Sequence, residues 1–135
     1  MSLIKWSKDY SVGIASIDEH HKIIIDYINE LFLAIERDEI EHVISRVLDG
    51  LLEYTEVHFV YEEDLFEMFG YQTSSEHHDE HQKFIVRLDR LIKDHKLGKV
   101  AIGMEVMDFL KQWLLNHILK SDMAYSQFLI EKGVK

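Results

Sequence analysis

The sequence contains no cysteine, no proline and only six glycines. Without cysteine, disulfide bonds, thiolate catalysis and sulfur-ligated metal sites are excluded. Proline and glycine are the strongest markers of turns, so their scarcity argues against a many-turned β fold and favours long helices. A chain of 135 residues is long enough to bury a core. We expect a single domain that covers residues 1–135.

Positive charge and long apolar runs are also scarce. The 15 Lys and Arg residues face 25 Asp and Glu residues, which gives a formal net charge of −10. This charge argues against nucleic acid or an anionic membrane as partner, because both select for basic surfaces. No apolar run approaches the ~18 residues of a membrane span. The start, MSLIKWSKDY, lacks the apolar stretch of a secretory signal, so we expect a cytoplasmic protein.

Four long segments carry apolar residues at helical spacing. They follow an arm over residues 1–12 and cover residues 17–37, 39–69, 73–95 and the chain from 100 onwards. Gly70 is a natural stop for the second segment, and Thr73 or Ser74 is a good N-cap for the third. A short amphipathic tail follows Ser121. These features predict an all-α, up-down four-helix bundle with an N-terminal arm and a short C-terminal helix.

The nine histidines fall into two groups by their place on these segments. In the stretch EHHDEH, residues 76–81, the first and last histidines share a stripe with Phe84 and Leu88, whereas His78 is rotated by ~100°. The histidines in phase with an apolar stripe use all four segments and are His21, His58, His77, His81 and His117. The histidines expected outside the core are His20, His42, His78 and His95. The acids of EHHDEH are expected in solvent.

Glu62 lies one helical turn after His58 on the same inward face. A buried ionised carboxylate costs several kcal/mol unless it is paired or binds a metal. No Lys or Arg shares the inward stripe near it. A single buried histidine is usually a hydrogen-bonded core residue, but five of them with an unpaired acid favour a metal site. Glu39-x-x-His42 imitates half of a carboxylate di-iron motif, yet it occurs once, on a charged face, and is set aside.

The number of ligands indicates two metal ions. Five histidines and one acid exceed the four ligands of a structural zinc, and nitrogen and oxygen ligands without sulfur suit first-row metals such as iron. Asp122 is the candidate for a second, bridging acid. It lies five residues after His117, roughly 140° away on a regular helix. It therefore points inward only if the helix breaks or bulges, and Ser121 is a plausible cap for a new short helix.

Two octahedral metals need about twelve ligand positions. Five histidines, two bridging carboxylates and a shared oxo or hydroxo group fill about eleven of these. One position stays open, and the histidines divide three and two.

Several motifs together resemble the hemerythrin family, and specifically the single-domain bacterial hemerythrins. They are W-x(6)-GI near the start, IDEHH, HFVYEE followed by GY, HHDEH, and WLLNHILKSD. The resemblance covers almost the whole chain. It implies a non-haem di-iron protein that reversibly binds O2 for storage or delivery and is not an enzyme.

The resemblance also assigns residues to two irons per chain, with a bridging oxo or hydroxo group. It implies that one iron is bound by His77, His81 and His117. The other, which has the open position for O2, would be bound by His21 and His58, with Glu62 and Asp122 bridging both. The residues that match the family's apolar O2 pocket are Ile24, Phe59, Trp113, Leu114 and Ile118. Tyr125 is either a partner of this site or an ordinary core tyrosine.

Two positions depart from the family pattern, and two other functions stay open. His20 stands where the family usually has glutamine, and Gln72 stands where it usually has proline. One alternative function is a sensor of O2, redox state or nitric oxide that signals to a separate partner. The other is a di-iron oxidase or peroxidase, although O2-activating di-iron bundles are richer in carboxylates. We expect a monomer.

Overall fold

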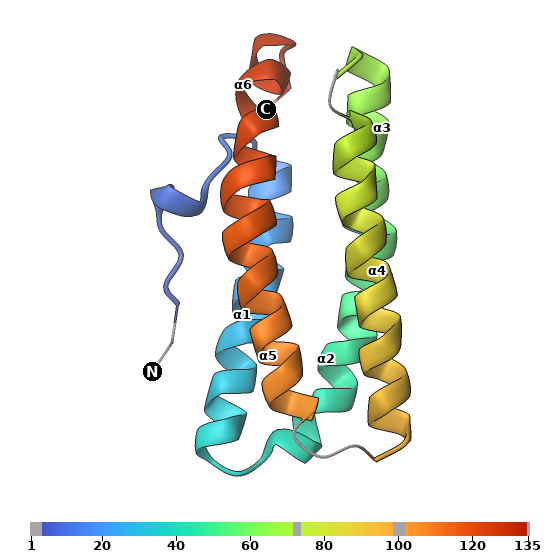
Figure 1. Ribbon diagram of the computed structural model, residues 1–135. Helices are drawn as coiled ribbons and strands as arrows, with labels where there is room; N and C mark the ends of the chain where they lie inside the picture. The colour runs from blue at the N-terminus through green and yellow to red at the C-terminus, as the bar shows by residue number, and fades with distance from the viewer. Residues whose placement is uncertain (1–3, 72–73, 99–101, 135) are drawn as a thin grey trace.

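The computed structural model describes residues 4–71, 74–98 and 102–134, and these residues form helices and no strand. In chain order the helices are η1 (Lys8–Tyr10), α1 (Ala15–Glu36), α2 (Ile40–Tyr54), η2 (Thr55–Phe59), α3 (Val60–Phe69), α4 (Ser74–Lys96), α5 (Ile102–Trp113), η3 (Leu114–Asp122) and α6 (Met123–Glu131). The runs α2–η2–α3 and α5–η3–α6 are each continuous, so with α1 and α4 they form four columns (Figure 1).

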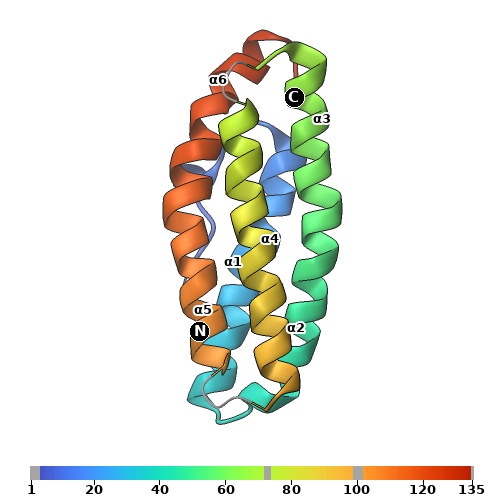
Figure 2. The ribbon, with the colours of Figure 1, turned by 45° about the vertical axis from the view of Figure 1, so that its right-hand side comes forward.

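Consecutive columns run in opposite directions, and α4 lies between α5 and the α2–α3 column in Figure 2. The arm before α1 is tied to that helix. The backbone N–H of Ile4 donates to Oδ1 of Asn29 at 2.8 Å, and Nδ2 of Asn29 donates to the Ile4 carbonyl at 2.7 Å. The predicted all-α, up-down bundle with an N-terminal arm and a short C-terminal helix is confirmed.

The helix ends follow local chemistry. Asp18 in the first turn of α1 accepts from the backbone N–H of Val12 at 2.8 Å, and a carboxylate suits a helix N-terminus. Gly70 ends α3 with φ +68°, a left-handed conformation that glycine adopts without strain. The predicted cap at Thr73, the side chains of Ser74 and Ser121, and the predicted helix start at Val100 lie outside the described part of the chain.

Two of the four columns contain a π-helical segment, in which hydrogen bonds close over five residues instead of four. The sequence predicts one uninterrupted helix over residues 39–69, and η2 is a departure from it. In the fourth column the predicted irregularity before Asp122 takes the form of a bulge, not a break. It spans the whole of η3, and the backbone at Asp122 (φ −71°, ψ −34°) continues into α6.

Buried apolar side chains form two clusters. The larger fills the interior along α1, α2, α4 and α5 and includes Ile24, Leu88 and Leu110. The smaller lies where the arm meets α3 and α6, and its buried members are Val12, Ile14, Ile17, Phe66, Tyr125 and Leu129. The polar residues of the next section contact both clusters.

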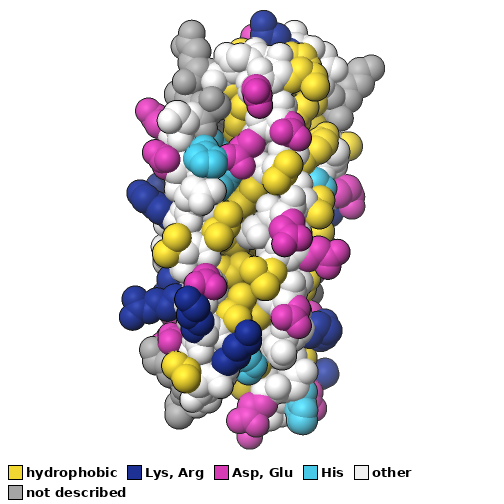
Figure 3. Space-filling model, turned by 90° about the vertical axis from the view of Figure 1, so that its right-hand side faces the viewer, with side chains coloured by type: hydrophobic (Ala, Val, Ile, Leu, Met, Phe, Trp, Pro, Cys, Tyr) yellow, Lys and Arg dark blue, Asp and Glu magenta, His cyan; other side chains and the backbone are white. Residues whose placement is uncertain are grey.

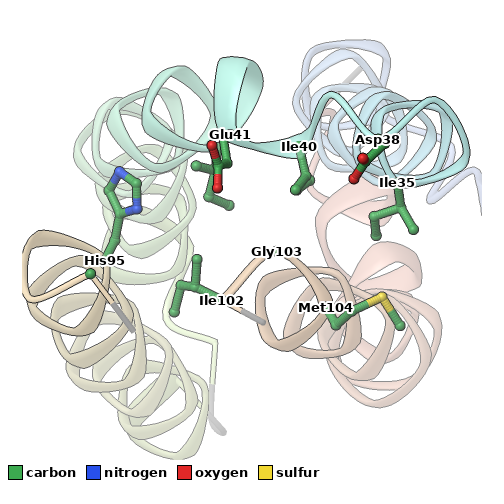
Figure 4. A pocket seen from close by; sticks show the side chains of 10 residues that line it. Ile35, Asp38, Ile40, Glu41, His95, Ile102, Gly103 and Met104 are labelled. Atoms are coloured by element: carbon green, nitrogen blue, oxygen red, sulfur yellow. The ribbon is translucent and has the colours of Figure 1, made fainter. Parts of the chain in front are cut away.

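A cavity of about 510 Å³ lies at the end of the bundle where α1 turns into α2 and α4 ends beside α5 (Figure 4). Its lining is mostly apolar, with Ile35 and Ile102, and includes Glu41 and His95. Neighbouring Gly103 marks a close approach of α5 to the start of α2. A Cβ placed on it would lie 2.3 Å from Cγ1 of Ile40.

The outer surface is mixed in character. Figure 3 shows hydrophobic side chains along the seam of the face that carries α3 and α4, with charged side chains on both sides of it. Exposed apolar residues such as Met68 and Val86 are normal on a protein surface. Among the described residues, no helix is both long and apolar enough to span a bilayer.

Candidate metal centre

The structure brings all seven predicted ligand residues together in the interior. Each column contributes at least one of them, and none is more than 4% exposed. The seven residues are His21, His58, Glu62, His77, His81, His117 and Asp122. The helices place them here because four amphipathic faces meet along one axis.

Asp122 reaches two sets of histidines with its two oxygens. Its Oδ2 lies 2.8 Å from Nε2 of His21. Its Oδ1 lies 2.8 Å from Nε2 of His77 and 2.9 Å from Nε2 of His117. The π-helical η3 makes this possible, because a turn closed over five residues returns Asp122 to the face of His117.

Glu62 also contacts both sets, through a single oxygen. Its Oε1 lies 2.9 Å from Nε2 of His58, 3.2 Å from that of His81 and 3.8 Å from that of His77. Its other oxygen, Oε2, accepts a hydrogen bond from the Tyr125 hydroxyl. The sequence left open whether Tyr125 is a partner of the site or an ordinary core tyrosine. This hydrogen bond makes Tyr125 a partner of the site.

The ligand atoms form two overlapping groups, in each of which all atoms lie within 4.8 Å of one another. One group is Glu62, His77, His81 and His117, and the other is His21, His58, Glu62 and Asp122. The histidines are thus divided three and two, with Glu62 common to both groups. This is the division that the family resemblance implies.

The chemistry of these atoms fits a cation. All five Nε2 atoms, Oε1 of Glu62 and both oxygens of Asp122 lack a hydrogen-bond partner among the described residues. Buried polar atoms are normally satisfied, so eight unsatisfied atoms facing one another are a strong exception. The ion pairs of both carboxylates within the described chain are with histidines, not with Lys or Arg. Imidazole nitrogens and carboxylate oxygens that face inward suit a first-row metal ion.

In the absence of metal, the pKa values of the buried histidines and carboxylates show how strongly these side chains interact. Burial alone would lower the pKa of His77, but close contact with Asp122 and Glu62 outweighs it and raises that pKa to about 10. In the same way Asp122 raises the pKa of His117, against its burial, to about 9. Burial would raise the pKa of Asp122 and of Glu62, but the surrounding histidines hold both well below the ordinary range.

Two carboxylates support the histidines from outside. Oε2 of Glu80 lies 3.2 Å from Nδ1 of His117, and Oε2 of Glu63 lies 3.7 Å from Nδ1 of His81. Neither contact meets the geometry of a hydrogen bond, but a carboxylate near the second nitrogen of a metal-binding histidine raises its basicity. The expectation that Glu80 lies in solvent is therefore wrong in part. Its side chain is 39% exposed, and it reaches across from α4 to the fourth column.

His20 is the second residue whose role the sequence did not predict. It is half-buried, and its Nδ1 lies 2.7 Å from Nδ1 of His58, a hydrogen-bond distance. Apolar periodicity shows that His21 is central, but it does not show how far its neighbour reaches towards the next column. His42 and His78 are exposed, and His78 pairs with Glu63.

Aromatic rings cover three of the histidines. Phe59 stacks on His81 with ring centroids 3.9 Å apart, and Trp113 stacks on His117 at 3.8 Å. Tyr54 stacks on His58 at 4.9 Å. The predicted pocket residues are all buried in the larger cluster, and they are Ile24, Phe59, Trp113, Leu114 and Ile118. Tyr54, which is not among the predicted pocket residues, belongs to the same cluster.

A surface groove approaches this region from solvent. It has a volume of about 290 Å³ and lies between α4 and the fourth column. Its lining includes Lys83, Phe109 and Asn116, and its floor reaches Trp113 and His117. One of the predicted ligand residues, His117, is thus part of the groove lining.

Comparison with known proteins gives a consistent answer. The family model described as "Hemerythrin HHE cation binding domain" matches residues 12–129. A bacteriohemerythrin of Pseudomonas aeruginosa is 37% identical over 125 residues, which is 93% of this chain and 80% of that protein. A bacteriohemerythrin of Methylococcus capsulatus is 30% identical over 131 residues, 96% of this chain and 98% of that protein.

Solved structures agree with the sequence relatives. Wild-type hemerythrin superposes with a TM-score of 0.78 at 30% identity, covering 93% of this chain and 97% of that one. A leucine-to-alanine mutant of hemerythrin gives a TM-score of 0.79 at 30% identity, covering 94% and 97%. With the matching family model, the sequence relatives and the shared bundle, this chain belongs to the hemerythrin family.

Proposed function

We propose that this protein is a non-haem di-iron protein that binds O2 reversibly, for storage or delivery, and is not an enzyme. The observation that carries the proposal is the pair of overlapping, fully buried groups of histidine and carboxylate atoms that share Glu62. A single tetrahedral metal would leave several of these atoms without a partner. Two ferrous ions, when bound, would supply the electrons and the open coordination position that O2 requires.

The residues of the chain would hold and orient the two ions. His77, His81 and His117 would bind one ion, and His21 and His58 would bind the other. Glu62 and Asp122 would bridge them, with an oxo or hydroxo group as third bridge. Glu80, whose Oε2 lies 3.2 Å from Nδ1 of His117, would raise the basicity of that ring.

The apolar side chains around the predicted O2 pocket favour the binding of a neutral ligand and disfavour side reactions. The predicted pocket is lined by buried apolar side chains, among them Ile24, Leu114 and Ile118. An apolar wall admits O2 and restricts the entry of water and protons, whose arrival would leave the irons oxidised. The histidine-rich ligand set also differs from the carboxylate-rich set of O2-activating di-iron bundles.

The decisive experiment is an anaerobic reduction of the iron-loaded protein, followed by titration with O2 under an optical spectrometer. We expect two irons per chain and an O2-dependent spectrum that reverses when O2 is removed. Metal analysis that finds one ion per chain, or zinc in preference to iron, would contradict the proposal. Steady consumption of an added reductant without a reversible O2 spectrum would support an oxidase or peroxidase instead.

A further inference from the structure

Two hydrogen-bond donors lie unsatisfied in the apolar cluster that contains the predicted O2 pocket residues. The hydroxyl of Tyr54 and the indole N–H of Trp113 are buried, and neither makes a hydrogen bond of normal length and angle among the described residues. The two side chains are 4% and 9% exposed. Buried tyrosine and tryptophan side chains normally find a partner for their polar atom. Two unsatisfied donors in one apolar cluster therefore need an explanation.

The rings that carry these donors belong to the metal centre. Tyr54 stacks on His58, and Trp113 stacks on His117. Phe59 contacts both rings, with ring centroids 5.7 Å from Tyr54 and 5.5 Å from Trp113. The donors thus come from facing columns and are placed by rings that contact a histidine of each group.

The electrostatic influences on the Tyr54 hydroxyl agree with this placement. Burial raises the pKa of Tyr54 well above its ordinary value, and the charges of Glu62 and Asp122 raise it further. A hydrogen-bonding interaction with the side chain of Trp113 lowers that pKa. The hydroxyl is therefore close enough to feel the carboxylates of Glu62 and Asp122 and the indole of the facing column.

We propose that Tyr54 and Trp113 form a two-donor subsite that hydrogen-bonds a small, electron-rich ligand in the pocket. This inference rests on the proposed function, because the ligand is held next to the open iron position. Apart from Trp113, the predicted pocket residues are Ile24, Phe59, Leu114 and Ile118, whose hydrocarbon side chains select by size but not by polarity. The two donors add preference for small anions, and for neutral ligands that gain negative charge on binding.

The test uses azide, a small linear anion, titrated into the oxidised, iron-loaded protein and followed by absorbance. Tyr54→Phe removes one donor while it keeps the ring, so azide affinity should fall about tenfold. Trp113→Phe should also weaken azide binding, and the double variant should bind more weakly than either single one. Tyr27→Phe is the matched control, since Tyr27 is half-buried over Gly50 and should leave affinity unchanged.

The outcomes separate this inference from the proposed function. If wild type binds azide and the Tyr54→Phe protein binds it within twofold as tightly with equal iron content, the subsite does not exist and the di-iron proposal stands. If iron-loaded wild type binds no azide, the open position is absent, and both ideas fail.

Thermal unfolding of the same proteins gives a second readout. Without azide, Tyr54→Phe should unfold at the same temperature as wild type or higher, because it removes an unsatisfied buried hydroxyl. Saturating azide should raise the wild-type midpoint more than that of the variant, since tighter binding stabilises more. A lower midpoint of the variant without azide, and an equal azide-induced rise, would show that Tyr54 is only a core contact.

Discussion

Each carboxylate oxygen of Asp122 contacts a different set of histidines. The position of this side chain must therefore be accurate. Its contacts of 2.8 and 2.9 Å come from three different columns. A residue in this position sets the separation of the two groups as well as their charge. Glu80, by contrast, touches the site from outside, through Nδ1 of His117.

Glu80→Gln should weaken iron binding without abolishing it. The change keeps the shape of the side chain but removes the negative charge that raises the basicity of His117. Loss of such an outer carboxylate typically costs about 10- to 100-fold in metal affinity. Competition with a chelator measures the effect, and Glu76→Gln, an exposed acid one turn earlier on α4, is the control. Equal iron retention by both variants would show that Glu80 is only a surface acid.

Leu114→Ser should speed the spontaneous oxidation of the iron centre. Leu114 is buried in the cluster around the predicted pocket, beside Trp113. A smaller, polar side chain there would admit water and protons to the centre. The measurement is the decay of the O2-dependent spectrum in wild type and variant, with iron content assayed in parallel. Identical decay at equal iron content would exclude Leu114 as a barrier.

At the scale of the elements, the π-helical η3 is the feature that completes the site. A π-bulge accommodates one extra residue within a helix. Deletion of Lys120, an exposed residue of η3, should therefore return this segment to α-helical geometry and keep Asp122 and Tyr125 facing inward. We expect the deletion protein to retain two irons per chain.

Deletion of Gln112 is the matched control for this experiment. Gln112 is exposed too, but it lies in the regular part of the column, in α5. Its loss rotates everything that follows by ~100° relative to the rest of α5, so iron should be lost. Iron analysis and far-ultraviolet circular dichroism of both proteins decide the point. Iron loss from the Lys120 deletion with intact helicity would show that the π geometry itself is required.

The elements also show how far sequence reasoning reaches. The inward phase of His21, His77 and His81 is predictable because α1 and α4 are regular helices with one apolar stripe each. The irregularity before Asp122 is predictable because a regular helix would turn this acid away from the face that carries His117.

The irregularity at η2 gives no such signal. His58 and Glu62 are four residues apart and share a face with or without it. The contacts of His20 and Glu80 are also beyond the sequence pattern. Periodicity identifies the inward face of a helix, but not which flanking side chain reaches the neighbouring column.

At the scale of the whole molecule, the metal-free protein should lose stability as pH rises. In the folded state the pKa values of His77 and His117 are raised from 6.5 to about 10 and about 9. Their contribution to stability is fully present below about pH 6.5 and disappears as pH rises through these folded values. The contribution of Asp122 and Glu62, whose pKa values are lowered, is lost only in strong acid.

Thermal unfolding of metal-free protein between pH 5 and 10 tests this, with about pH 6 as the expected range of greatest stability. The iron-loaded protein should behave differently, because bound metal already requires neutral histidines. It should keep its stability towards pH 9 and lose metal in acid. A metal-free protein whose unfolding midpoint is unchanged up to pH 10 would contradict the assigned pairing of His77 and His117 with Asp122.

The polar layer divides the interior into two apolar compartments. Phe66 and Tyr125 of the smaller cluster contact His77 from one side, and Phe59 of the larger cluster contacts His81 from the other. Between these two compartments the helices continue, but the buried side chains that lie between them are the candidate metal ligands. When the candidate ligand residues bind metal, the two apolar compartments should unfold together. Without metal, backbone amides around Phe66 and Leu129 should exchange with solvent well before those around Leu88 and Leu110.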